Sequence, residues 1–506
     1  MEISWLIFLA IFTISLFKFL LKKTPTSNLP PGPPKLPLIG NLHQLAKGNI
    51  LPHRRFAQLA AVHGPIMHLK LGEISTVVMS TAEMAREVMK THDAVFCNRP
   101  SLRVGKELFY EFTDIGLAPF GEYWRQVRKI SAFELFTTKR VESFRPIREE
   151  EVAELMESLR LEAGSTINLS KKLFGLTFNI SSRVTFNKKG KGREEFHALI
   201  AGIVEAASGF SIADVYPSFG TLLHSISGMK KKFKKLVEQT NRILDPIIEE
   251  HMTKKKDRGN NDNDDYNEDL VDVLLKFHKD NAQPTQEFSL STDNVKAVLL
   301  EVFGAGSETS STVMEWAMSE LLKNPKAMEK VQSEVRQAYQ EKGTVDETTV
   351  HELKYLKHVI RETLRLHPPV PLLVPRQSME RCQISSYDLP PKTRVIINAW
   401  AIARDPKFWP EPEKFNPNRF EECSINYKGN TNFELIPFGG GRRRCPGMTL
   451  GIANVELPLA MLLYHFDWKL PRGVESPESL DLDESYGITM RRKNDLYVIP
   501  IPYPNQ

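Results

Sequence analysis

A single thiol in a basic, glycine-rich stretch is the most chemically suggestive feature of this 506-residue sequence. Cys445 follows Arg443 by two residues in FGGGRRRCPG, which begins at Phe438 and ends at Gly447. A thiolate is a strong soft ligand for iron, and nearby positive charge favours the thiolate over the thiol. Small residues, Gly441 among them, let the backbone approach a flat ligand and direct amide N–H groups at the sulfur. An isolated cysteine is usually structural, but this pattern predicts that Cys445 binds iron.

The second feature is an acid beside a hydroxyl in the middle of a predicted helix. Apolar periodicity predicts a helix over 291–323, and Gly304 and Gly306 lie inside it. Each glycine costs about 1 kcal/mol relative to alanine, which indicates a nearby ligand or a local distortion. Glu308 and Thr309 follow and could hold and transfer protons. The alternative is a helix-packing site with incidental polar residues, and both interpretations fit the segment taken alone.

Two pairs at helical spacing form further candidate groups. Glu362 and Arg365 are three residues apart in RETLRLHPP and share a helix face, as a surface ion pair or as part of a buried network. Trp124 and Arg128 are four residues apart in YWRQVRKI. An arginine fork can bind both oxygens of a carboxylate, whereas core packing is the simpler interpretation of the tryptophan.

Composition argues against several function classes. The net charge of +5 is too weak to indicate nucleic acid as a partner. The chain has no phosphate-binding G-x-x-x-x-G-K-[ST] and no G-x-G-x-x-G after a predicted strand, so electrons for redox chemistry must come from a partner. The four cysteines form no C-x-x-C pair, which indicates a reducing compartment, and without C-x-x-C-H any haem is held without covalent links.

The N-terminus predicts a membrane anchor followed by a stiff spacer. The run from Ile3 to Leu21 carries one charge and is about long enough to cross a bilayer as a helix. Lys22 and Lys23 follow it, so the positive-inside rule places the rest of the chain in the cytosol. Prolines then stiffen the chain. We therefore predict a membrane anchor at 1–23, a proline-rich hinge at 24–41 and one folded domain at 42–506.

The elements that must position the candidate residues are mainly helices. Short runs of strand character lie at 66–72, 75–80, 394–400 and 495–500. The pattern predicts a mainly α fold with small β-sheets. Apolar periodicity predicts helices at 81–90, 122–136, 140–160, 192–207, 229–252, 291–323, 325–341 and 350–366.

The sequence resembles the haem-thiolate monooxygenases of the cytochrome P-450 family, and most of all the membrane-bound plant enzymes of secondary metabolism. The family pattern F-x-x-G-x-R-x-C-x-G is complete at Phe438, Gly441, Arg443, Cys445 and Gly447. The resemblance runs along the whole chain. It implies a single large haem-thiolate monooxygenase domain behind an N-terminal transmembrane helix, on the cytosolic side of the endoplasmic reticulum membrane. It also implies non-covalent haem b with the Cys445 thiolate as axial ligand, and electrons from NADPH through a flavoprotein reductase.

The resemblance also implies roles for residues outside the cysteine loop. The family motif A/G-G-x-[D/E]-T matches Ala305, Gly306, Glu308 and Thr309, which implies that Glu308 and Thr309 are catalytic and deliver protons during oxygen activation. A buried structural network is implied for Glu362, Arg365 and Arg419. The implied cofactor-binding residues are Trp124, Arg128, Arg376, Phe438, Arg443 and Gly447, with the tryptophan and the arginines at the haem propionates.

The expected substrate is a neutral, hydrophobic plant secondary metabolite, because the segments that line the substrate pocket in the family are mostly apolar here. Overall likeness favours a sesquiterpene or a diterpene, with an alkaloid or a flavonoid or other phenylpropanoid as the alternative. A haem-thiolate isomerase or dehydratase, or a haem sensor, fits less well with the retained acid–threonine pair. The other expected partners are O2, the reductase and the lipid bilayer. Candidate substrate-contacting residues are Phe112, Phe303, Ala305, Leu372, Leu373, Val374, Ile488 and Met490.

Overall fold

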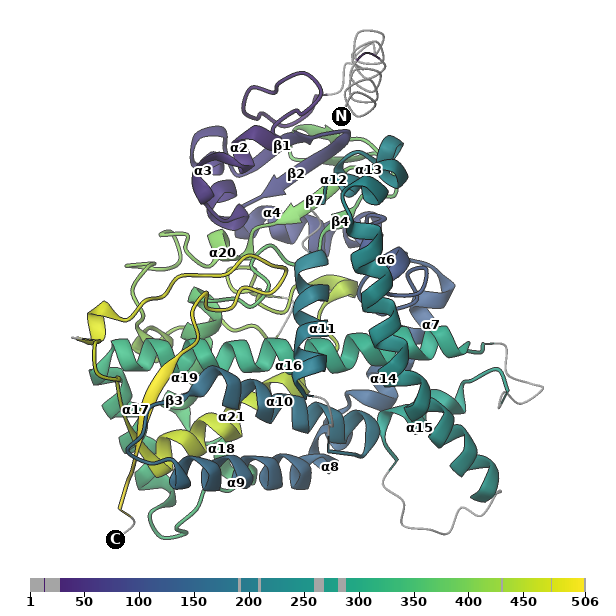
Figure 1. Ribbon diagram of the computed structural model, residues 1–506. Coiled ribbons are helices and arrows are strands. Elements are labelled where there is room, and N and C mark those ends of the chain that lie inside the picture. The colour runs from purple at the N-terminus through teal and green to yellow at the C-terminus, as the bar shows by residue number, and fades with distance from the viewer. Residues whose placement is uncertain are drawn as a thin grey trace.

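One long helix, α16 (Thr292–Lys323), crosses the middle of the molecule (Figure 1). The computed structural model describes Thr13 and residues 28–189, 193–207, 211–258, 268–280, 288–428, 431–474 and 476–504. A capping box fixes the start of α16, since the side chains of Ser291 and Asn294 each accept a hydrogen bond from the backbone of the other. Most of α16 is buried because other helices cover it.

The helices that contact α16 come from distant parts of the chain. Contacts are made by α10 (Leu169–Phe186), α19 (Lys354–Leu366) and α21 (Met448–His465). Two predicted helices end in π-helical turns, η2 (Glu87–Thr91) and η3 (Ser131–Leu135). The remaining α-helices are α2 (Leu42–Leu45), α3 (Pro52–His63), α4 (Ala82–Arg86), α5 (Asp93–Phe96), α6 (Arg103–Glu107), α7 (Glu122–Ile130), α8 (Thr138–Ser143), α9 (Arg145–Leu161), α11 (Arg193–Ala206), α12 (Ile212–Val215), α13 (Gly220–Ile226), α14 (Met229–Arg258), α15 (Leu270–Lys276), α17 (Pro325–Tyr339), α18 (Glu347–Val350) and α20 (Ala399–Ile402).

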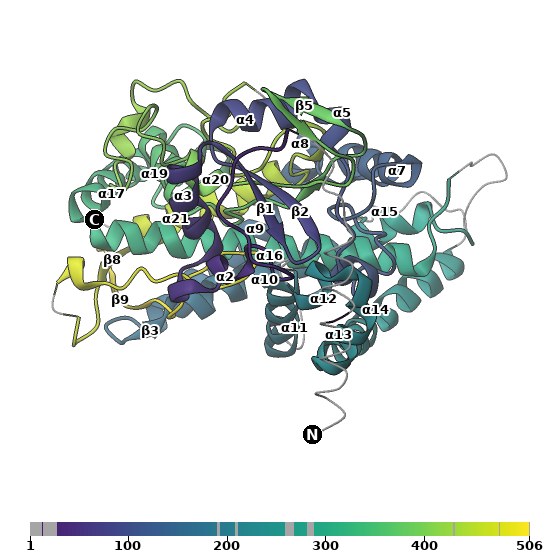
Figure 2. The ribbon, with the colours of Figure 1, turned by 90° about the horizontal axis from the view of Figure 1, so that it is seen from above.

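The largest sheet joins an early segment of the sequence to one about 300 residues later. Its order is β1 (Ile66–Leu71), β2 (Ile74–Met79), β7 (Arg394–Ile397) and β4 (Arg376–Gln377). β1 pairs antiparallel with β2, which pairs parallel with β7. Seen from above, β1 and β2 lie over the helical body (Figure 2). The smaller sheets contain β3 (Ile167–Asn168), β9 (Tyr497–Pro502) and β8 (Phe466–Lys469), and β5 (Cys382–Ile384) with β6 (Tyr387–Leu389).

The structure confirms a mainly α, single-domain fold with small sheets. The predicted strand segments overlap β1, β2, β7 and β9, and the predicted helix over 291–323 corresponds to α16. Within the described residues, no helix combines the length and the apolar character needed to span a bilayer. The predicted anchor at 1–23 lies outside the described residues apart from Thr13, and the hinge at 24–41 is described from Asn28 onward.

Candidate active site

A glycine turn holds the Cys445 loop. Gly441 adopts a φ of 64°, and a side chain there would collide with the Met89 carbonyl and the Asp93 carboxylate. The turn therefore requires glycine. The Cys445 N–H donates to the Phe438 carbonyl at 3.0 Å, which closes the loop shortly before α21 begins.

The Cys445 thiol lies at the wall of an internal space. The Cys445 side chain has accessible surface, yet protein surrounds it. The space that it borders therefore lies inside the molecule. Burial raises the pKa of the thiol, while a hydrogen bond from the backbone of Gly447 and the positive charge of Arg128 act in the opposite direction. Metal ligation requires the thiolate, so the amide and the guanidinium favour it.

The middle of α16 presents an accessible strip in an otherwise buried helix. Ala305 is exposed and Gly306 and Thr309 are half-buried, whereas Gly304 and Ser307 are buried. A helix that crosses the core can be accessible at such positions only where it borders free space. This strip contains three of the four residues that match the family motif.

The helix α21 brings the thiol and this strip to the same region. It begins at Met448, three residues after Cys445, and packs against α16. A Cβ added to Gly451 would lie 3.9 Å from the Ser310 hydroxyl, so the two helices approach closely there. An enclosed thiol and an accessible helix face in one region fit a flat group held between them.

The two predicted catalytic residues differ in their surroundings. The Thr309 hydroxyl donates to the Ala305 carbonyl at 2.7 Å, which leaves its oxygen free to accept a hydrogen bond. The Glu308 side chain is 4% exposed, and its Oε1 atom has no hydrogen-bond partner among the described residues. Burial raises the pKa of Glu308, and Arg491, whose Nη1 atom lies 3.8 Å from Oε1, opposes this effect.

Four guanidinium groups lie near the Cys445 loop, and that of Arg443 is within electrostatic range of the other three. Arg99, Arg376 and Arg443 are buried and Arg128 is half-buried. Burial, followed by the charges of Arg443 and Arg376, lowers the pKa of Arg99. Burial likewise lowers the pKa of Arg443 to about 10, and Arg376 and Arg128 add to the effect. So much buried positive charge needs anions nearby.

The protein's own acids offset this charge only in part. Asp93 pairs with Arg376 at 3.1 Å but also with Arg442 at 2.9 Å. Burial raises the pKa of Asp114 to about 6 and that of Glu301 to about 8, so these carboxyl groups are not fully ionised at neutral pH. The two propionates of a haem would supply the missing negative charge, so the residues present fit this cofactor.

The cytochrome P-450 family model matches residues 30–498.

The chain belongs to the cytochrome P-450 family.

Relatives of this P-450 support the assignment over nearly the full length. The chain is 50% identical to desmethyl-deoxy-podophyllotoxin synthase from Sinopodophyllum hexandrum, over 97% of this chain and 96% of that protein. It is 48% identical to tabersonine 16-hydroxylase 2 from Catharanthus roseus and 46% identical to premnaspirodiene oxygenase from Hyoscyamus muticus, over 98% of each chain in both cases. The structure of a zebrafish cytochrome P-450 with abiraterone matches with a TM-score of 0.74 at 26% identity, over 90% of this chain and all of that one. The protein is therefore an oxidoreductase of the monooxygenase class, and the family implies haem.

The predicted propionate-binding residues lie together, and their side chains donate hydrogen bonds to backbone carbonyls of the protein. Arg376 donates to the Gly440 carbonyl at 2.5 Å, and Arg128 donates to the Arg444 carbonyl at 2.6 Å. Arg443 donates to three backbone carbonyls, those of Cys97, Ile115 and Ala118, and lies 4.2 Å from the Trp124 ring. The Trp124 indole N–H donates to the Ile115 carbonyl at 3.0 Å. This contact gives Trp124 a positioning role, and a propionate contact would require its N–H to change partner.

The other two predicted cofactor-binding residues flank the thiol. The Phe438 ring is half-buried and lies 5.3 Å from the Tyr427 ring. A Cβ added to Gly447 would meet the Phe136 ring at 3.8 Å. Their roles toward haem stay predictions.

Three of the site residues were not predicted. Arg99 donates to the carbonyls of Gly116, Val374 and Pro375, and so ties the 114–117 segment to the 374–376 segment. Glu301 accepts from the Ile115 N–H at 2.6 Å, and Asp114 accepts from the Leu117 N–H at 2.8 Å. The available signal was a lone acid, Glu301, in an apolar helical run, four residues before Ala305.

The candidate substrate residues do not form one group. Leu372, Leu373, Ile488 and Met490 line a small cavity of about 30 Å³. Phe112 and Val374 are half-buried and Ala305 is exposed. The buried Phe303 ring instead lies 4.0 Å from the Phe196 ring and 5.1–5.4 Å from the Phe186 and Phe178 rings. Core packing therefore explains Phe303 better than substrate contact does.

The structure brings the predicted structural network together. Glu362 lies 2.7 Å from Arg365 and 2.9 Å from Arg419, and its carboxylate also accepts from the Asn416 N–H. The Glu362 and Arg365 side chains have no exposed surface. The alternative of a surface ion pair is therefore wrong.

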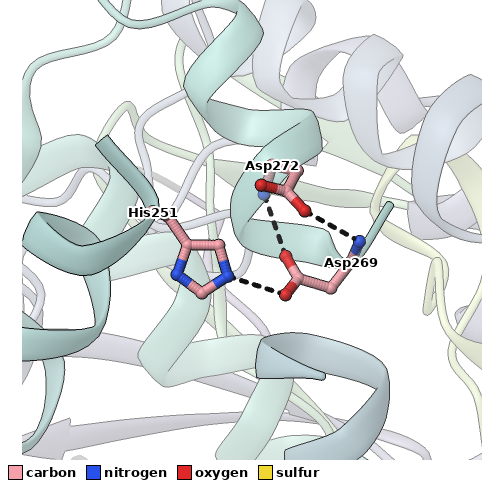
Figure 3. Close-up of side chains that lie close together, drawn as sticks. All are labelled: His251, Asp269 and Asp272. Carbon is pink, nitrogen blue, oxygen red and sulfur yellow. Dashed lines mark hydrogen bonds and ion pairs between the residues drawn. The ribbon is translucent and has the colours of Figure 1, made fainter. Parts of the chain in front are cut away.

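A histidine–aspartate cluster at the junction of α14 and α15 has the composition of a metal site (Figure 3). Its ligand atoms are already engaged, since His251 lies 2.7 Å from the Ile247 carbonyl and 2.8 Å from Asp269. Asp269 and Asp272 form the capping box of α15. Burial alone lowers the pKa of His251, but the hydrogen bond and charge of Asp269 raise it overall. The cluster therefore links two helices through the His251–Asp269 pair.

Proposed function

We propose that this P-450 hydroxylates a neutral, hydrophobic plant secondary metabolite, and we favour a sesquiterpene or a diterpene. The observation that carries the chemistry is the enclosed Cys445 thiol in the same region as the accessible Ala305–Thr309 strip. The apolar side chains around the small cavity support a substrate without charge. A relative named for premnaspirodiene supports a terpenoid.

Haem b, when bound, supplies oxygen activation with electrons that come from NADPH through a partner flavoprotein reductase. Cys445 is the residue that would hold its iron, and the arginines near the loop would hold its propionates. Thr309 offers a hydrogen bond on the accessible strip of α16, and the buried Glu308 beside it holds a proton. The surrounding apolar side chains orient the substrate and exclude water.

The alternative substrate classes use the same site. Relatives named for tabersonine and for desmethyl-deoxy-podophyllotoxin support an alkaloid or a phenylpropanoid. Isomerase or dehydratase chemistry without O2 remains the minor alternative, and the retained Glu308–Thr309 pair argues against it.

We also propose that the protein sits on the endoplasmic reticulum membrane, with the predicted anchor at 1–23 as its single span. Exposed apolar side chains support this on the described part of the chain. These side chains lie on two segments, one near Leu38 and one near Tyr216. The Tyr216 hydroxyl donates to the Leu38 carbonyl at 3.4 Å and so joins the two segments. The exposed residues are Leu36, Ile39, Ile212, Leu222 and Ile226.

The deciding experiment is a spin-state titration of the holoprotein. A sesquiterpene hydrocarbon, a diterpene, an indole alkaloid and a flavonoid are added separately, and the haem absorbance is recorded. A change toward high spin with a terpene alone, followed by a hydroxylated product with reductase and NADPH, is the expected result. A change with the alkaloid or the flavonoid alone would overturn the terpenoid proposal.

A further inference from the structure

The carboxyl group of Glu308 faces a single charged group. It is buried, and Oε1 has no hydrogen-bond partner among the described residues. The Nη1 atom of Arg491 lies 3.8 Å from Oε1, which is too long for a hydrogen bond but close enough for a strong electrostatic interaction in a poorly solvated place. Arg491 is also the only charge that influences the pKa of Glu308 among the described residues.

The backbone of Arg491 is held in place by contacts on both sides. The Arg491 carbonyl accepts from both the N–H and the hydroxyl of Ser485, at 2.9 and 3.2 Å. The preceding residue, Met490, accepts from the indole N–H of Trp316 at 3.0 Å and donates to the Pro369 carbonyl at 2.8 Å. Trp316 lies on α16, the helix that carries Glu308. The two residues are therefore fixed relative to each other through one helix.

The Arg491 side chain connects the buried acid with solvent. It is 35% exposed, whereas Glu308 is 4% exposed. An ion pair with one member in contact with water gives the buried member a route to exchange protons. A fully enclosed carboxyl group would lack such a route.

The other charged groups near Arg491 do not replace Glu308 as its partner. Glu315, two turns further along α16, bonds the Ser170 hydroxyl, and its pKa is raised to about 7 by burial. Arg492 donates to the Ser319 hydroxyl at 3.2 Å. On α11, burial and then the charge of Arg491 lower the pKa of His197, which disfavours the charged form of this side chain. Asp495 acts on Glu315 and His197, is exposed, and accepts a hydrogen bond from the Asn168 amide at 2.8 Å.

We propose that Arg491 is a positioning residue that makes Glu308 a reusable proton donor. Glu308 gives up its proton to a water molecule in the free space beside its neighbour Thr309 and becomes a carboxylate paired with Arg491, which stays protonated throughout. The carboxylate then takes a proton from solvent water at the Arg491 end and returns to its starting form. Without the guanidinium, the buried carboxylate is too unfavourable to form and the donor cannot release its proton readily. The inference uses the Glu308 role implied by the family and applies to any substrate.

The test combines infrared spectroscopy with turnover in the holoprotein. The carboxyl stretching band of Glu308 is identified as the band that is lost in Glu308→Gln, and its pH midpoint is then measured in the wild type and in Arg491→Gln, Arg491→Lys and Lys493→Gln. We expect the midpoint to rise by about one pH unit in Arg491→Gln. Product formed per NADPH consumed should fall about tenfold in the same variant. Arg491→Lys should restore most of both values, and Lys493→Gln, an exposed neighbour, should match the wild type.

The controls separate this role from a structural one. The carbon monoxide difference spectrum shows that each variant is folded with its thiolate ligand. If Arg491→Gln does not fold, the comparison is made with Arg491→Lys instead. An unchanged midpoint in a folded Arg491→Gln variant would overturn the proposal, even if turnover falls. Normal coupling in Glu308→Gln would also overturn it. The infrared measurement needs no substrate, so failure of the terpenoid proposal does not affect it.

Discussion

Two glutamates in this P-450 are buried to almost the same extent and have opposite surroundings. Glu362 on α19 has no exposed surface and is bonded by two arginines and a backbone N–H. Glu308 on α16 is 4% exposed and has a single cation at 3.8 Å. A buried carboxylate that is fully hydrogen-bonded is held in one state, whereas one that is incompletely bonded can change its protonation state. The comparison distinguishes a carboxylate that stabilises the fold from one that can carry protons.

The largest expected effect is on folding and comes from Glu362→Gln. The substitution leaves the buried Arg365 without its counter-ion, which should lower the free energy of unfolding by about 3–5 kcal/mol. Urea unfolding and the yield of haem-bound protein measure this. Glu380→Gln, at an exposed position, is the matched control. Wild-type stability in Glu362→Gln would remove the distinction between the two glutamates.

Glu308→Gln should affect catalysis and leave folding nearly unchanged. No hydrogen bond to Oε1 is lost among the described residues, so the free energy of unfolding should change by less than about 0.5 kcal/mol. Loss of a general acid should reduce product formation about 100-fold while oxygen consumption continues. Product analysis beside an oxygen electrode checks this. A stable variant with normal product yield would show that the acid is dispensable.

The third prediction concerns the pH dependence of stability. Burial and the charge of Asp114 raise the pKa of Glu301 to about 8, above its ordinary value of 4.5. Because the folded state favours the protonated group, this stabilisation is present below about pH 4.5 and is lost as the pH rises through about 8. Glu301→Gln should remove this loss between pH 5 and 9, measured as unfolding free energy against pH. The same slope in wild type and variant would contradict the shifted pKa.

The smallest effects are expected at two apolar residues, one that stabilises the core and one that borders the free space beside α16. Phe303 packs among other phenylalanine rings, so Phe303→Leu should cost about 1 kcal/mol of stability and leave the product pattern unchanged. Ala305 borders free space, so Ala305→Val should keep its stability and change the product ratio several-fold. Thermal unfolding and chromatography of the products measure the two properties. A reversed outcome would place Phe303 in the substrate pocket after all.

Local patterns in the sequence predicted part of this structure well. The cysteine loop is a contiguous motif, and α16 has a clear start signal and apolar periodicity, so both could be predicted. The helix α10 was not predicted, because 13 of its 18 residues are buried and its polar face is a narrow stripe that includes Asn179 and Arg183. The link between Asp114 and Glu301 also had no signal. It joins residues almost two hundred positions apart, and only the tertiary fold brings them together.

The pairing of β2 with β7 has a consequence for how the protein is made. Met79 pairs with Ile397, so one edge of β2 stays unpaired while roughly 300 further residues leave the ribosome. At about 5–20 residues per second this takes about 15–60 s. During that time an apolar strand edge is open to pairing with other chains. The largest sheet can therefore close only late in synthesis, and until then this edge is a place where newly made chains can aggregate.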